Sequence, residues 1–247
     1  MNAATFRGTG TATTRRLGIA TIAALVFLVV SGLVFSAEDV VQGDSVRIMY
    51  VHVPSIWVAY MAFVLSAVCS AVYLSKRGRS IAWDRFAGAS GEIGVVFVAI
   101  SLVTGSMWGR LTWSKYWVWD ARLTSTAFLF ITYVGYLAVR RLGGTVDQRA
   151  RRSAVVALLA VLEIPLVHFS VKFWNTLHQS ASVADPNAKV QMDGYMLFTL
   201  FWGLITFSTM FAWLVLHRQR VLALEDIEGS HGLDRAITER RNEAGVN

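Results

Sequence analysis

The stretch WGRLTWSKYWVWDARLTS occupies residues 108–125 and lies between two long apolar runs. It holds four of the nine tryptophans, mixed with charges of both signs: Trp108, Trp113, Trp117, Trp119, Arg110, Lys115, Asp120 and Arg122. Indole rings favour a membrane surface because their bodies are apolar and their N–H groups need a partner. Four indoles in one connection exceed an ordinary aromatic belt, although two of them could be belt anchors. The stretch therefore predicts a platform for a large, flat, partly apolar ligand.

The composition around this stretch is that of a membrane protein. Of the 247 residues, 55% are hydrophobic and 16% are charged, whereas soluble domains carry about 25% charged residues. The net charge of +7 does not indicate nucleic acid, because the basic residues are scattered at helix ends rather than gathered on one face. The single cysteine, Cys69, excludes an internal disulfide, and the sequence has neither a CxxC pair nor a CxxCH haem-attachment motif.

Six apolar runs predict an all-α integral membrane protein, a bundle of six transmembrane helices. Each is close to the roughly 20 residues that cross a bilayer, too long for the roughly 10-residue strands of a barrel. We place the helices near residues 17–36, 51–75, 92–107, 123–140, 153–173 and 194–217. The first is interpreted as a retained helix rather than a cleaved signal peptide. Residues 1–220 then form the membrane domain, and residues 221–247 form a cytoplasmic tail.

The distribution of basic residues predicts the orientation of the bundle. Six of the 23 Lys and Arg residues fall on the side of the tryptophan-rich stretch: Arg47, Arg110, Lys115, Arg122, Lys172 and Lys189. The other 17 lie on the opposite side, in the N-terminus, the second and fourth connections and the tail. Because basic residues favour the cytoplasmic side, both termini are expected in the cytoplasm, and the tryptophans are expected to face outward.

Two of the five histidines are predicted to meet at the tryptophan-rich face. His52 begins the second apolar run, and His178 follows the fifth, whereas His217 and His231 lie on the cytoplasmic side. His168 lies within the fifth run and is interpreted as a helix-packing residue. A single histidine at a helix end is more often an interfacial residue than a ligand. Two that converge from distant parts of the chain favour an iron or metal site, since imidazole is a common metal and haem ligand.

The surrounding residues favour haem over a bare metal ion. A porphyrin needs apolar ring surfaces, and its propionates need cations, which Arg110, Lys115 and Arg122 could provide. Trp117 and Trp119 are spaced to point to the same side of an extended loop, so both could lie against one flat ligand. Asp120 could pair with Arg122 or cap the helix that begins near Leu123.

Three separated segments resemble one family of haem-handling membrane proteins. MWGRLTWSKYWVWDARLTS (107–125) resembles the tryptophan-rich WWD motif in the form found in the haem exporter protein C family of bacterial cytochrome c maturation. YVHVPSIWV (50–58) and SVKFWNTLHQSAS (170–182) match in the same order. Two larger relatives, the cytochrome c haem lyase subunit and the synthetase of the other maturation system, typically continue the motif as WDPxE. The resemblance covers nearly the whole chain, and it implies six helices with both termini inside.

The resemblance also implies a function, a site and partners. It implies a subunit of the bacterial inner membrane that holds non-covalent haem b in transit at the periplasmic face and delivers it to a periplasmic haem chaperone. His52 and His178 would be the axial ligands of the haem iron, with the tryptophans and Asp120 as the platform. The implied partners are the ATPase and membrane subunits of an ABC transporter and a small single-helix subunit.

Two interpretations of function remain open at this stage. No Walker A motif occurs in the sequence, so we expect neither ATP hydrolysis nor another enzymatic activity from this chain. The alternative to haem transfer is a permease-type subunit that moves haem or another substrate through the bundle. Intramembrane charges would favour the permease, but only Glu163, Lys172 and Glu92 come close to being such charges. Haem transfer is therefore the favoured interpretation.

Overall fold

The computed structural model describes residues 10–75, 78–178 and 192–243. Within these ranges the chain is helical and contains no strand, with the helices α1 (Ala12–Val30), α2 (Met49–Leu74), α3 (Ile81–Trp113), α4 (Ala121–Arg141), α5 (Val146–Ala160), α6 (Glu163–Phe173) and α7 (Gly194–Glu243). Six helical segments are long and apolar enough to cross a membrane. The predicted all-α, six-span fold is confirmed. Four residues used for the orientation lie outside the described ranges: Arg7, Lys76, Arg77 and Lys189.

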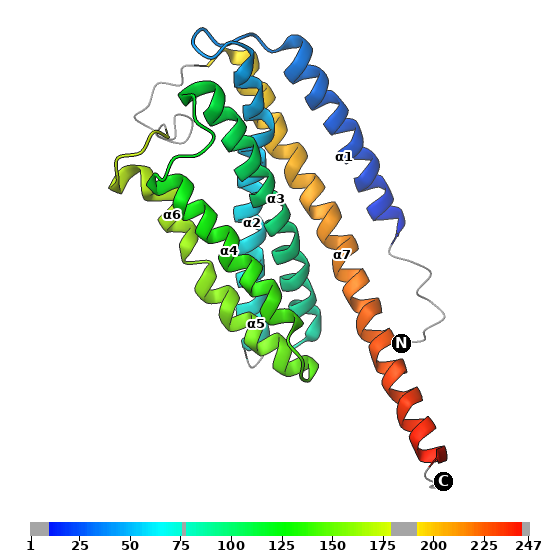
Figure 1. The fold of residues 1–247 in the computed structure, drawn as a ribbon. Helices are drawn as coiled ribbons and strands as arrows, with labels where there is room; N and C mark the ends of the chain where they lie inside the picture. The colour runs from blue at the N-terminus through cyan, green and yellow to red at the C-terminus, as the bar shows by residue number, and fades with distance from the viewer. Residues whose placement is uncertain (1–9, 76–77, 179–191, 244–247) are drawn as a thin grey trace.

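The bundle is built around the α2–α3 pair, which forms the most extensive helix contact (Figure 1). Helices α4 and α5 pack on one side of this pair, with α6 against α4, and α7 packs on the other side. Helix α1 lies at the edge of the molecule against α7. The start of α1 and the end of α7 point toward one end of the bundle, and the α3–α4 connection and the end of α6 lie at the other (Figure 1).

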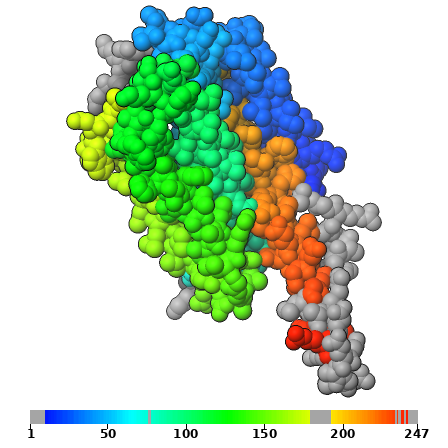
Figure 2. Space-filling view, viewed as in Figure 1, coloured from blue at the N-terminus to red at the C-terminus, as the bar shows by residue number. Residues whose placement is uncertain are grey.

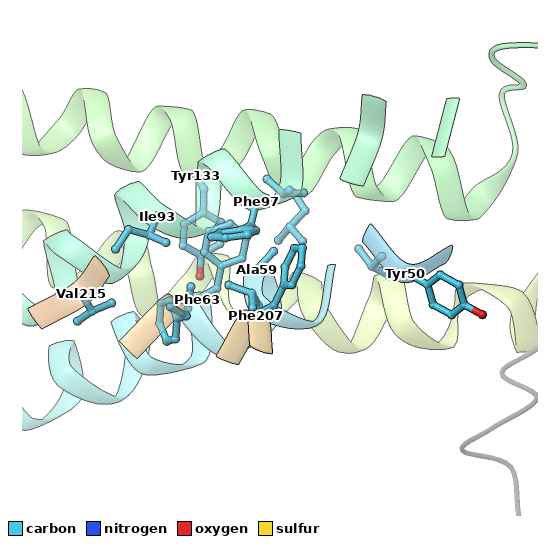
Figure 3. Packing of buried hydrophobic residues seen from close by; sticks show 14 of the residues in the cluster. Tyr50, Ala59, Phe63, Ile93, Phe97, Tyr133, Phe207 and Val215 are labelled. Carbon is cyan, nitrogen blue, oxygen red and sulfur yellow. The ribbon is translucent and has the colours of Figure 1, made fainter. Parts of the chain in front are cut away.

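Aromatic stacking fills the centre of the bundle (Figure 3). The rings of Phe63 and Tyr133 stack with centroids 3.5 Å apart and planes at 14°, which joins α2 to α4. A Cβ atom at Gly94 of α3 would collide with the Phe63 ring. The glycine therefore lets α2 and α3 approach closely, as small residues do in membrane bundles.

Helix α3 is much longer than the predicted run of 92–107. It begins after Ser80, whose hydroxyl accepts from the Ala82 amide at 3.4 Å, and it ends at Ser114, which has a left-handed φ of 60°. The charge in its first turn is paired across the bundle: the Asp84 carboxylate accepts from Arg140 of α4 at 2.6 Å. The prediction followed the apolar run alone and therefore began the helix too late.

The fifth run, predicted as one helix over 153–173, is divided into α5 and α6 at Val161 and Leu162. Pro165 explains the division, because it has no N–H to offer the carbonyl oxygen of Val161, and its ring crowds that oxygen. The two helices together still form one span, Val146–Phe173.

Helix α7 runs through the predicted end of the sixth span at 217 and through the predicted domain boundary at 220 without a break. Figures 1 and 2 show it extending past the other helices. Ion pairs hold it where it leaves the bundle: Asp226 accepts from Arg85 of α3 at 2.9 Å and from Arg149 of α5 at 3.2 Å. The assignment of 221–247 as a cytoplasmic tail stays a prediction, but its described part is helical.

Candidate functional site

His52 lies in the first turn of α2, where its half-buried ring packs against α3. Its Nδ1 atom is 3.1 Å from the carbonyl oxygen of Ser101 and 3.2 Å from Oγ1 of Thr104. A Cβ atom at Gly105 would stand 2.8 Å from Cε1 of the ring. The Trp108 indole meets the same ring edge to face, with centroids 5.7 Å apart. The imidazole therefore rests on one face of α3, and its ring edge meets the Trp108 indole of the same helix.

His178 lies on the segment that follows α6 and is held through the backbone of that segment. The amide of His178 donates to Oγ1 of Thr176 at 3.1 Å, and the amide of Leu177 donates to Oδ2 of Asp120 at 3.2 Å. The His178 ring meets Trp113 with centroids 6.4 Å apart. Because Trp108 and Trp113 both belong to the last turns of α3, the two histidines that the sequence singled out lie at the same end of the bundle.

Asp120 joins two parts of this end of the molecule. Its Oδ1 accepts from the amide of Leu123 at 2.8 Å, so the carboxylate caps the start of α4 as one interpretation of the sequence expected. Its Oδ2 accepts from Leu177, and the residue is only 9% exposed. The carboxylate is therefore a fixed point between α4 and the segment that carries His178.

Arg122 does not pair with Asp120 in this structure. Its Nη2 atom donates to the carbonyl oxygen of His168 at 3.3 Å. Its Nε atom is buried and makes no hydrogen bond within the described part of the chain. Arg122 lies within electrostatic range of His52 and of Tyr60. Arg122 is thus a cation whose buried Nε atom has no partner among the described residues.

The four tryptophans do not all lie in one connection between helices. Trp108 and Trp113 belong to the last turns of α3, because that helix extends beyond its predicted end. The Nε1 atom of Trp108 donates to Oε1 of Gln42 in the α1–α2 connection at 2.7 Å, so this part of that connection covers the α3 end. Trp117 and Trp119 lie in the α3–α4 connection.

The expectation that Trp117 and Trp119 both lie against one flat ligand does not hold in this structure. Their rings meet at 81° with centroids 5.6 Å apart, and perpendicular rings cannot both stack on one plane. The edge-to-face arrangement is the one that aromatic quadrupoles favour. Trp119 is 81% exposed, whereas Nε1 of Trp117 is buried and has no hydrogen-bond partner among the described residues.

The remaining cations of the stretch are exposed, and His168 adjoins Arg122 through its carbonyl oxygen. Arg110 is exposed and lies over the Tyr116 ring, with its guanidinium carbon 5.8 Å from the centroid. Lys115 is also exposed. The His168 side chain is exposed rather than packed between helices, because Val167 and Ser170 are the residues of α6 that face inward. His217 packs against Trp213, far along α7.

Comparison with known proteins gives the family. A family model described as Heme exporter protein C matches residues 1–231. The chain belongs to the haem exporter protein C family. It is 37% identical to Heme exporter protein C of Haemophilus influenzae over 201 residues, which cover 80% of this chain and 79% of the relative. The same identity holds over 229 residues for the protein of that name from Bradyrhizobium diazoefficiens, with 89% and 86% covered.

A more distant relative comes from a plant. The chain is 32% identical over 192 residues to a protein of Arabidopsis thaliana named "Putative cytochrome c biosynthesis ccmC-like mitochondrial protein", covering 78% of this chain and 71% of the relative. The haem exporter family model spans α1 to α6 and ends within α7. Both histidines and the whole tryptophan-rich stretch lie inside the matched range.

Several residues of the site were not identified from the sequence. Ser101, Thr104 and Gly105 are small residues inside an apolar run and carry no ligand chemistry of their own. Gln42 is a single amide in a polar connection. Their importance comes from packing of α3 against α2 and of the α1–α2 connection against α3, which sequence spacing does not reveal.

Proposed function

We propose that this member of the haem exporter protein C family holds haem b at the periplasmic face of the bacterial inner membrane, with His52 and His178 as axial ligands. Membership gives the coarser function, which is haem handling in cytochrome c maturation. The observation that carries the proposal is the convergence of two imidazoles from opposite halves of the chain at the end of the bundle that bears the tryptophans.

The donors at this end suit haem better than a bare metal ion. The described residues contain no group of three or more His, Cys, Asp or Glu side chains able to hold a metal ion. Haem supplies four nitrogen ligands of its own, so two imidazoles complete the iron. Arg122, whose buried Nε atom has no partner in the described part of the chain, is suited to a haem propionate. Trp108 and Trp113, each against one of the histidines, provide apolar surface for the ring.

The proposed orientation rests on the basic residues. We infer that both termini are cytoplasmic and that the histidines face the periplasm, because 17 of the 23 Lys and Arg residues lie on the side opposite the tryptophans. Fusions of a periplasm-active reporter after Ser45 and Ser114 should be active, and fusions after Arg79 and Thr145 should be inactive. The reverse pattern would place the tryptophans in the cytoplasm and refute delivery to a periplasmic chaperone.

The proposed role is transfer within a larger assembly. We infer that the chain passes haem to a periplasmic haem chaperone beside the ATPase and membrane subunits of an ABC transporter and a small single-helix subunit. The family name supports an exporter complex. ATP hydrolysis is assigned to another chain, because this sequence has no Walker A motif.

The ligand assignment is tested with five alanine variants purified at matched expression. His52→Ala and His178→Ala should each lower the haem-to-protein ratio, because each removes one iron–imidazole bond. The matched controls, His168→Ala, His217→Ala and His231→Ala, should keep the wild-type ratio. An equal ratio in all five variants would refute the axial ligands.

A permease role is the second candidate, and Glu163 is the observation that favours it. The carboxylate lies inside the fifth span, where Oε1 accepts from the Thr132 hydroxyl at 2.8 Å. Its Oε2 atom is buried and has no partner among the described residues. Ionisable residues inside spans often mark transport paths. If Glu163→Gln abolished haem delivery while the two-histidine haem spectrum was unchanged, the permease role would gain the advantage.

A further inference from the structure

We propose that Thr104 is a positioning residue for His52, which together with the carbonyl of Ser101 fixes the imidazole so that Nε2 is presented to the haem iron. The inference rests on the proposed ligation by His52. It adds which ring nitrogen binds iron and which part of α3 holds the ring before haem arrives.

The hydrogen-bond partners decide which nitrogen carries the proton. A carbonyl oxygen can only accept, so the contact of Nδ1 with Ser101 at 3.1 Å requires a hydrogen on Nδ1. The Thr104 hydroxyl directs its single hydrogen back into its own helix, toward the carbonyl oxygen of Ile100 at 2.8 Å or of Ser101 at 3.3 Å. Its oxygen therefore also accepts from Nδ1, at 3.2 Å. The Nδ1–H group is shared between two acceptors, as in other three-centre bonds.

This arrangement leaves the lone pair of Nε2 available. A neutral imidazole has one donor nitrogen and one acceptor nitrogen, so a proton held at Nδ1 makes Nε2 the only ligand atom. Metal-bound histidines generally donate their second N–H to a carbonyl or a similar acceptor, which fixes the ring and raises its basicity. Ser101 and Thr104 supply that acceptor pair from successive turns of α3.

Gly105 provides the space that the arrangement needs. A Cβ atom there would stand 2.8 Å from Cε1 and 3.3 Å from Nδ1 of the ring. The absence of a side chain lets the imidazole rest against the helix surface, where Nδ1 reaches both oxygens. Ser101, Thr104 and Gly105 together are called the α3 cradle below.

The experiment replaces His52 by a free ligand. The His52→Gly variant is purified with haem and titrated with imidazole and with 1-methylimidazole, which ligates iron but has no N–H. Imidazole should bind more tightly, by roughly three- to tenfold, the usual worth of one hydrogen bond. In the double variants, Thr104→Val should shrink this preference and Thr104→Ser should retain it. Thr112→Val is the matched control, because the hydroxyl of Thr112 donates within its own helix, to the Trp108 carbonyl at 2.9 Å.

The possible outcomes distinguish the positioning role of Thr104 from the proposed ligation of haem iron by His52. Equal affinity for the two ligands, or a preference that Thr104→Val leaves unchanged, would overturn the α3 cradle while ligation at position 52 stood. No response of the haem spectrum to either ligand would overturn ligation by His52 itself.

If His52→Gly does not fold, a second measurement tests the role of Thr104 in the chain that keeps His52. In the full-length chain with His52 present, Thr104→Val should shift the haem midpoint potential and the low-spin ferric EPR signal, since it removes an acceptor from the ligand. Thr104→Ser should restore both, and Thr112→Val should change neither. Identical spectra and potentials for Thr104→Val and wild type would overturn the proposal.

Discussion

The two histidines of the site are held in different ways. The His52 ring is fixed directly, by an acceptor pair and a glycine on a neighbouring transmembrane helix. The described bonds around His178 fix its backbone, through Thr176 and through Asp120 on Leu177, on a segment that lies beyond the end of α6. One half of the site is thus part of the bundle, and the other lies on a following segment that is bonded to Asp120 and meets Trp113 of α3. Different substitutions should therefore weaken the His52 half and the His178 half of the site separately.

Gly105→Ala is expected to have the largest effect on the His52 half. The added methyl would stand 2.8 Å from the ring, so the imidazole must leave its acceptors. Disrupting the partners of a metal ligand typically costs 10- to 100-fold in affinity, and we expect about a tenfold loss of haem affinity, measured by haem titration of the purified variant.

Gly135→Ala is the control for that prediction, because a Cβ atom at Gly135 meets nothing within 4 Å. It should bind haem as the wild type does. Wild-type affinity in Gly105→Ala would mean that the packing of the ring on α3 is not important for haem binding.

Arg122→Ala is the next strongest test of the same half. A charge-assisted bond from Arg122 to a haem propionate would contribute on the order of 1.5 kcal/mol, so haem affinity should fall by up to about tenfold. Arg110→Ala is the matched control and should change affinity by less than about twofold, because its exposed charge is well solvated. Equal losses in the two variants would assign the effect to net charge rather than to a propionate contact.

Asp120 tests the His178 half. Asp120→Ala removes the cap of α4, which typically costs about 1 kcal/mol, and it also releases Leu177. We expect a several-fold loss of haem and a lower melting temperature. Asp120→Asn keeps one oxygen as a cap acceptor but cannot serve both Leu123 and Leu177.

The asparagine variant therefore separates the two jobs of the carboxylate. We expect near-normal thermal stability, because asparagine is a good N-cap, together with weakened haem retention. If Asp120→Asn retained haem fully, the bond to Leu177 would have no part in presenting His178.

The smallest effect on bound haem is expected from the α3–α4 connection. Trp117→Ala combined with Trp119→Ala should cost about 1 kcal/mol or less in haem binding, since only one of two perpendicular rings can stack on the ligand. Loading of the chaperone should fall at least as much as bound haem, because Trp119 is 81% exposed and available to a partner. If the double variant loaded the chaperone normally once haem was resupplied, Trp117 and Trp119 would contribute to haem binding but not to its presentation.

The sequence was sufficient for the six spans and for the placement of His52 and His178 at the same end of the bundle, because apolar length and topology determine both. The sequence was not sufficient where the bounds or side-chain positions of one helix depend on its contacts with another helix. The third span was predicted to begin at residue 92, whereas α3 begins at Ile81 with Asp84 paired to Arg140 of α4. Pro165 was visible, but its division of the fifth run was not anticipated. The perpendicular rings of Trp117 and Trp119, and the contact of Thr104 with His52, arise from packing that spacing cannot predict.

The central claim is that His52 and His178 together ligate one haem iron. Its most direct test is the low-temperature EPR and near-infrared magnetic circular dichroism of the purified protein with ferric haem bound. We predict a low-spin bis-imidazole spectrum at one haem per chain, converted to a five-coordinate high-spin spectrum in either His52→Ala or His178→Ala. A wild-type spectrum that is already high-spin, or one that either variant leaves unchanged, would contradict the account.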